Sequence, residues 1–127
     1  MSLRSDLGRV RGLGSAKSGS HHWWHQRLTA IALIPLSLWF ITTLMKHMSD
    51  SHHEAVAWIS SPFITALLIA LVISVFYHAK LGMQVVIEDY VHLEFAKVAL
   101  LIAVNLALAF GLLLGVVAIL KISFGMA

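Results

Sequence analysis

Long apolar runs separated by short polar segments dominate the chain. Three of these runs contain no Asp, Glu, Lys or Arg: Leu28–Met45, Ala55–Ala79 and Val98–Leu120. Each run can cross a hydrocarbon core of ~30 Å as a helix, which takes ~20 residues. Membrane-spanning strands would alternate in polarity, and these runs do not. The pattern therefore predicts an all-α integral membrane protein with three transmembrane helices, at about 24–48, 55–89 and 94–123.

The polar segments around these helices also lead to expectations. Residues 1–22 are basic and rich in glycine and serine, so we expect a basic cytoplasmic arm, followed by a transmembrane anchor over residues 23–127. No small-residue cleavage site follows the first apolar run, which favours a retained span over a signal peptide. We expect Ser49–Glu54 to be an outer loop, and Pro62 to lie in the first turn of the second helix.

Composition restricts the class of protein further. Of the 127 residues, 59% are hydrophobic and only 12% are charged, which is too little charge to cover a soluble domain. The chain has no cysteine, which excludes disulfides, an iron–sulfur cluster held by this chain and c-type haem attachment. No glycine-rich nucleotide fingerprint is present, and no nucleic-acid partner is expected. Because so little of the chain lies outside the membrane, any soluble catalytic module would belong to another subunit.

Positive residues predict the orientation in the membrane, because they are enriched in cytoplasmic loops. Only two of the nine, Lys46 and Lys121, fall on the side of the first connection and the C-terminus. The sequence thus predicts an N-terminus on the inner, cytoplasmic side of the membrane and a C-terminus on the outer side. The seven others fall on the opposite side: Arg4, Arg9, Arg11, Lys17, Arg27, Lys80 and Lys97.

The main candidate for chemistry within the spans is His78. Ionisable residues inside a membrane are functional candidates, and imidazole is a usual axial ligand of haem iron. At ~100° per residue, Gly82 and Asp89 fall within roughly 40° of His78 on a continuous helix. Gly82 would leave room for a flat macrocycle one turn further inward. The alternative is a histidine that only forms a hydrogen bond to a carbonyl of a neighbouring helix.

Asp89 and Tyr90 form a second candidate site, ~16 Å from His78 toward the inner surface. A phenol and a carboxylate at the membrane boundary suit a quinone, because quinone reduction needs hydrogen-bond donors and protons. The alternative is an ordinary helix end with an interfacial tyrosine.

A second haem ligand is expected from another subunit. His47 lies at the outer end of the first helix, far from the depth of His78. His25 lies roughly a turn deeper than the level of His78, which makes it a poor partner.

Two stretches, GLGSAKSG…HHWWHQRLTAIALIPL and HAKLGMQVVIEDYVH, resemble the hydrophobic membrane-anchor subunits of succinate dehydrogenase, respiratory Complex II, in their alphaproteobacterial form. The resemblance covers nearly the whole chain. It implies that His78 is an axial ligand of haem b, with the other axial histidine supplied by a second membrane-anchor subunit. It also implies that Tyr90 and Asp89 form part of the ubiquinone site. The membrane would be a bacterial inner membrane, with the C-terminus in the periplasm and with flavoprotein and iron–sulfur subunits bound on the cytoplasmic face. The chain would then be one subunit of a heteromeric helical bundle, and not catalytic alone.

The resemblance leaves some roles open. It favours Arg27 as a charge near the haem propionates or the quinone pocket, whereas the sequence alone fits a positive-inside anchor equally well. His21, His22 and His25 have no assigned role. An anchor of a quinol:fumarate reductase is an alternative function, since direction depends on the partners. A small proton or ion carrier using His78, Glu88 and Asp89 is less well supported, because the spans contain no charged residue.

Overall fold

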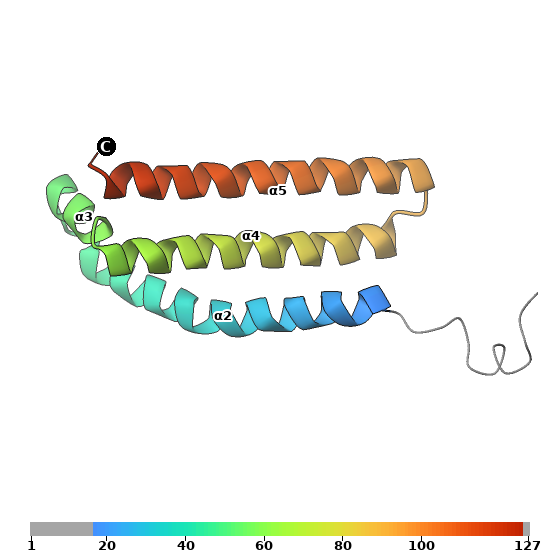
Figure 1. Cartoon of the computed structure of the whole chain (residues 1–127), viewed down its shortest axis with the longest axis horizontal. Helices are drawn as coiled ribbons and strands as arrows, with labels where there is room; N and C mark the ends of the chain where they lie inside the picture. The colour runs from blue at the N-terminus through green and yellow to red at the C-terminus, as the bar shows by residue number, and fades with distance from the viewer. Residues whose placement is uncertain (1–16, 126–127) are drawn as a thin grey trace, which may run out of the picture.

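The computed structural model describes residues 17–125, and within that range four helices follow one another. They are α2 (Lys17–His47), α3 (His52–Ile59), α4 (Pro62–Tyr90) and α5 (Glu94–Ser123). The three long helices lie antiparallel in a row with α4 in the middle, and short α3 lies at one end (Figure 1). At 29 to 31 residues each, they are ~45 Å long, enough to cross a bilayer including its headgroup layers. The predicted all-α class with three membrane-spanning helices is confirmed.

The first helix begins earlier than the sequence predicted. α2 starts at Lys17, within the segment expected to be an arm, and residues 1–16 of that arm lie outside the described residues. A single interior glycine, Gly19, costs only about 1 kcal/mol relative to alanine, so it does not stop the helix. Pro35 lies inside α2, which is visibly curved in Figure 1. Proline removes one backbone hydrogen bond and bends a helix in this way.

The second predicted helix, about 55–89, is divided in the structure. α3 ends at Ile59, and α4 begins at Pro62 after an extended Ser61. Proline disfavours helical geometry in the residue before it, so the apolar run cannot continue as one helix through this point. Pro62 is nevertheless in the first turn of α4, as its fixed φ favours.

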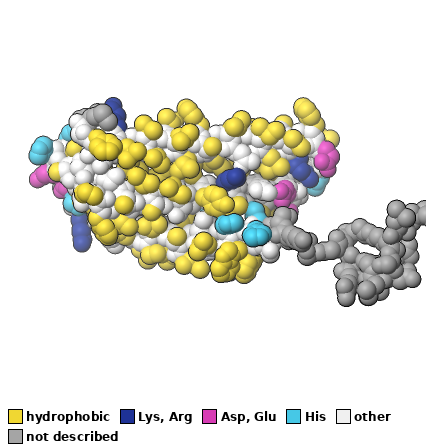
Figure 2. All heavy atoms as spheres, viewed as in Figure 1, with side chains coloured by type: hydrophobic (Ala, Val, Ile, Leu, Met, Phe, Trp, Pro, Cys, Tyr) yellow, Lys and Arg dark blue, Asp and Glu magenta, His cyan; other side chains and the backbone are white. Residues whose placement is uncertain are grey.

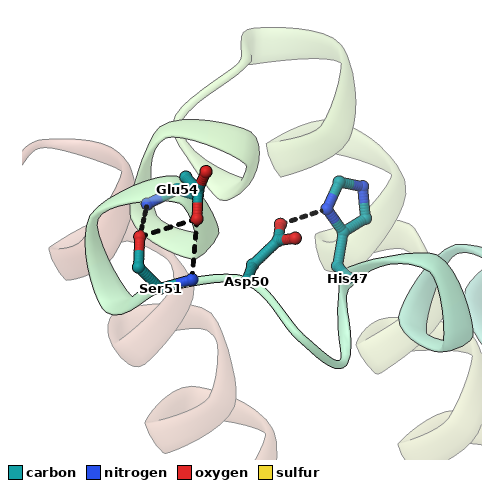
Figure 3. Close-up of polar contacts among 4 residues, drawn as sticks. All are labelled: His47, Asp50, Ser51 and Glu54. Carbon is teal, nitrogen blue, oxygen red and sulfur yellow. Dashed lines mark hydrogen bonds and ion pairs between the residues drawn. The ribbon is translucent and has the colours of Figure 1, made fainter.

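The segment Ser49–Glu54 is only partly the predicted loop, because it includes the start of α3. Ser51 caps this helix: its backbone N–H donates to the Glu54 carboxylate, and its hydroxyl accepts from the Glu54 backbone N–H (Figure 3). This reciprocal capping box satisfies two donors at the helix start. Before it, the His47 ring lies 2.5 Å from the Asp50 carboxylate and stacks on Trp58 at 4.5 Å between centroids. These contacts fix the turn between α2 and α3.

Close contact between α4 and α5 depends on two glycines of α5. A Cβ placed on Gly111 would lie 2.6 Å from the Phe76 ring, and one on Gly115 would lie 3.0 Å from the Val72 side chain. The first distance is shorter than real side chains show, and the second is tight enough that Val72 would have to shift. The Gly-x-x-x-Gly spacing thus marks a helix–helix contact in this chain.

Burial is concentrated on the central helix. Within the described part of the chain, the buried side chains all belong to α4, and α2 and α5 leave most of their large apolar side chains exposed. Figure 2 shows hydrophobic side chains over the middle of the molecule, with charged and histidine side chains mostly toward its two ends. An apolar surface of this extent needs lipid or other subunits to cover it. The buried residues are Thr65, Leu68, Leu71, Leu81 and Ile87.

Candidate functional site

His78 lies at the contact between α4 and α2 and is half-buried there. Its Nδ1 lies 2.9 Å from the Thr29 hydroxyl oxygen. That hydroxyl also lies 2.9 Å from the backbone carbonyl of His25 and 3.0 Å from that of Gln26. The imidazole therefore forms a hydrogen bond with a side chain of the neighbouring helix. The alternative considered from the sequence was a hydrogen bond to a backbone carbonyl of that helix.

The second ring nitrogen of His78 faces the side chain of Gln26. The two Nε2 atoms lie 3.5 Å apart, which is the long limit of a hydrogen bond. The carbonyl oxygen of the same amide, Oε1, is buried without a partner. The Gln26 amide is also the nearest group to Gly82, 4.0 Å from where a Cβ on that glycine would lie. The space that Gly82 leaves open is thus bordered by a flexible side chain and not by backbone.

The other histidines near this end of α2 have surroundings of their own. The His25 ring packs edge-on against Tyr77, with centroids 5.9 Å apart, and stacks with His21 at 6.4 Å. His22 Nε2 is buried without a partner. No group of three or more His, Asp or Glu side chains comes together as a metal site in residues 17–125.

Asp89 and Tyr90 lie in the last turn of α4, and both side chains are exposed. Tyr90 is 78% exposed, so nothing in the described chain encloses its phenol. Glu88 beside them accepts a hydrogen bond of 2.8 Å from Gln84. The predicted quinone residues are therefore presented at the end of the helix, apart from His78.

Arg27 is exposed and directed toward an aromatic ring of its own helix. Its guanidinium carbon lies 5.1 Å from the centroid of the Trp23 ring, a distance typical of a cation–π contact. This contact leaves the guanidinium N–H groups available to a further acceptor.

A groove of about 200 Å³ lies between α4 and α5. Its lining is mostly apolar and includes Phe76, with Lys80 and Asn105 as polar members. Neither His78 nor Tyr90 contributes to it. The groove is thus separate from both predicted sites.

Comparison with known proteins identifies the family. Residues 1–118 match the model of the succinate dehydrogenase/fumarate reductase transmembrane subunit. The chain belongs to this family. It is 40% identical over 104 residues to the succinate dehydrogenase hydrophobic membrane anchor subunit of Rickettsia bellii, covering 82% of this chain and 83% of that one. It is 42% identical over 106 residues to the corresponding subunit of Rickettsia conorii, with the same coverage of both chains.

A more distant relative supports the same assignment. The succinate dehydrogenase membrane anchor subunit of Reclinomonas americana is 34% identical over 89 residues, covering 65% of this chain and 71% of the relative. The resemblance stated from the sequence is therefore confirmed. A member of this transmembrane-subunit family is a component of an oxidoreductase complex and is not catalytic alone.

Reasoning from the sequence did not single out two residues that contact His78, namely Gln26 and Thr29. Both are common polar types with no motif of their own, and Thr29 is 49 positions from the histidine it contacts. One signal was present. His22, Gln26 and Thr29 recur at helical spacing on one face of α2, and polar residues repeated on one face of a span indicate a helix–helix contact.

Proposed function

We propose that this family member is the membrane-anchor subunit of a succinate:ubiquinone oxidoreductase, in which His78 is one axial ligand of haem b. The second axial histidine would come from a second anchor subunit. The observation that supports this most directly is the environment of the His78 ring. One nitrogen is held by Thr29 at 2.9 Å, while the other faces only a long contact with a flexible amide.

The residues around His78 fit a haem ligand. A metal-bound histidine almost always donates its other ring N–H to an acceptor, which fixes the orientation of the ring. Thr29 provides such an acceptor, and the unpartnered Gln26 Oε1 marks a polar contact that the chain alone leaves incomplete. When bound, haem b would supply one-electron redox chemistry. Arg27, with free N–H groups on an exposed guanidinium, suits a propionate carboxylate or the quinone pocket.

Ubiquinone is the proposed substrate at Tyr90 and Asp89. As electrons reach the quinone, its carbonyl oxygens gain negative charge, which a phenol O–H stabilises at hydrogen-bond distance. Asp89 beside it would orient the phenol or pass protons from the cytoplasmic side. The exposure of both side chains fits a site that is completed by other subunits. The flavoprotein and iron–sulfur subunits are the proposed partners on this cytoplasmic face.

The haem assignment is tested by His78→Ala in the purified complex. The reduced-minus-oxidised spectrum should lose or strongly shift its b-type bands. His53→Ala, an exposed histidine of α3 at the opposite end of the molecule, is the matched control and should keep the spectrum. Full haem content with an unchanged spectrum in His78→Ala would reject the assignment.

The quinone assignment is tested by Tyr90→Phe. Succinate-to-quinone turnover should fall, while succinate oxidation with an artificial acceptor at the soluble subunits should persist. Loss of one hydrogen-bond donor costs ~2.7–4 kcal/mol in enclosed sites, and a partly wet site should lose less. Tyr77→Phe removes the other tyrosine of the chain, which packs on His25, and should leave quinone turnover intact. Unchanged quinone turnover and affinity in Tyr90→Phe would make Tyr90 an interfacial residue only.

The family description also includes fumarate reductase, so a quinol:fumarate reductase anchor is the second candidate. The same complex assayed with quinol and fumarate would distinguish the two directions. Higher turnover with quinol and fumarate than with succinate and quinone would favour the second candidate.

A further inference from the structure

The Thr29 hydroxyl has one proton and three neighbours that could share it. Two of these neighbours are the backbone carbonyls of His25 and Gln26, at 2.9 and 3.0 Å, and carbonyl oxygens only accept. The third is His78 Nδ1, at 2.9 Å. Threonine in a helix commonly donates to a carbonyl three or four residues back. With its proton directed to its own helix, the hydroxyl presents a lone pair to the imidazole.

This arrangement favours one tautomer of His78. A lone pair on the Thr29 oxygen requires a proton on Nδ1, so the neutral ring has its free lone pair on Nε2. The Gln26 contact agrees, because the amide presents its NH₂ donor to Nε2 at 3.5 Å. The opposite tautomer would place an N–H against that donor. The two contacts from α2 are therefore mutually consistent.

We propose that Thr29 is the positioning residue for His78: it accepts the Nδ1–H bond, orients the ring and leaves Nε2 as the ligating atom. The Gln26 amide lies 3.5 Å from Nε2, so it would have to move for that nitrogen to hold iron. This inference rests on the proposed function, since it assumes that His78 ligates haem. Thr29 itself does not contact the iron.

The proposal has a measurable electronic consequence. An imidazole that donates its N–H to an acceptor is a stronger electron donor to a metal, and it stabilises ferric over ferrous iron. Removal of an outer-shell partner typically lowers metal affinity by ~10–100-fold. If ferric affinity falls ~10-fold more than ferrous affinity, the midpoint potential rises by ~59 mV.

The experiment compares Thr29→Val and Thr29→Ser in the complete purified complex, with haem retention and midpoint potential as readouts. Thr29→Val keeps the shape but removes the acceptor, so haem should dissociate ~10–100-fold more readily and the potential should rise. Thr29→Ser keeps the hydroxyl acceptor, so haem affinity and midpoint potential should both stay at their wild-type values. Thr29→Cys, a small side chain with a much weaker acceptor, gives the same comparison if the valine variant does not assemble.

Thr42→Val is the matched control. The Thr42 hydroxyl donates to the carbonyls of Leu38 and Trp39 at 2.9 and 3.0 Å, the same pattern as Thr29, but it is exposed and contacts no histidine. Its substitution should leave haem affinity and potential unchanged.

The possible outcomes separate the inference from the function that it assumes. If His78→Ala loses haem while Thr29→Val keeps wild-type affinity and potential, the inference is overturned and the haem assignment stands. If Thr29→Ser changes both as much as Thr29→Val does, the hydroxyl is not the group responsible and the inference again fails. If His78→Ala keeps its haem with an unchanged spectrum, the haem assignment on which the inference rests is itself rejected.

Discussion

Gly111→Ala tests the contact between α4 and α5. The added Cβ would lie 2.6, 3.1 and 3.7 Å from three atoms of the Phe76 ring, and the first is about 0.8 Å short of the 3.4 Å at which ordinary contact begins. Overpacking of this kind costs ~1–3 kcal/mol. Alanine recovers up to ~1 kcal/mol of helix propensity, so the net loss of stability should be ~0–2 kcal/mol.

A second glycine gives the graded comparison. At Gly115 the added Cβ meets one atom of Val72 at 3.0 Å, so a smaller shift relieves the contact. Gly115→Ala should therefore be less destabilising than Gly111→Ala. Unfolding in mixed detergent micelles, followed by tryptophan fluorescence, gives the free energy of each variant. Ala107→Gly, at an exposed position of α5, measures helix propensity without packing.

A double mutant isolates the steric term. In a Phe76→Ala background the ring is gone, so Gly111→Ala should become neutral or stabilising by up to ~1 kcal/mol. The interaction energy between the two positions should then be ~1–3 kcal/mol. The reasoning is refuted if Gly111→Ala has the same effect with and without the Phe76 ring.

Three further predictions concern the ends of the helices. The Ser51 hydroxyl and backbone N–H hold the pKa of Glu54 below its ordinary value of 4.5; this stabilisation of α3 is present above that value and lost as pH falls through the lowered pKa. Hydrogen exchange should show α3 fraying in the wild-type chain on acidification, and in Ser51→Ala already at neutral pH. Equal protection of α3 in the wild-type chain and in Ser51→Ala at neutral pH would contradict this. Thr65→Val removes a buried hydroxyl bonded to two backbone carbonyls and to Ser123, so unfolding in micelles should show ~1–2 kcal/mol of lost stability. Ser123→Ala should lose less stability than Thr65→Val. If neither variant is less stable than the wild-type chain, the hydrogen bonds of the Thr65 hydroxyl do not stabilise this end of the bundle. A reporter fused after Ala127 should be active only in the periplasm, and cytoplasmic activity would reverse the proposed orientation.

Hydropathy alone was enough to predict the three long helices, because lipid requires continuous apolar helices. It could not locate the break between α3 and α4. The apolar run from residue 55 continues through that point, and only Pro62 and its neighbours end one helix and begin another. The start of α2 was also placed too late, because serine and histidine give no apolar signal even where they are helical.

The candidate site was predictable only in part. His78 stood out because it is a titratable group in an uncharged span. Its partners Thr29 and Gln26 did not, since their importance depends on how α2 packs against α4, which local sequence does not specify. Tyr90 and Asp89 remain predictions. Both lie in the last turn of α4 with exposed side chains, and no group of the described chain encloses the Tyr90 phenol.

The single row of helices has a consequence for biogenesis. Because α4 alone has buried side chains in the described chain, an unassembled copy has almost no interior of its own. Subunits that pack against its exposed faces would stabilise it by mass action, so its free energy of folding should rise with their concentration. A newly inserted copy without partners would have these faces covered by lipid alone, and the lack of that added stability would leave it more open to proteolysis. The level of this subunit in the cell should therefore follow the supply of its partners more closely than its own rate of synthesis.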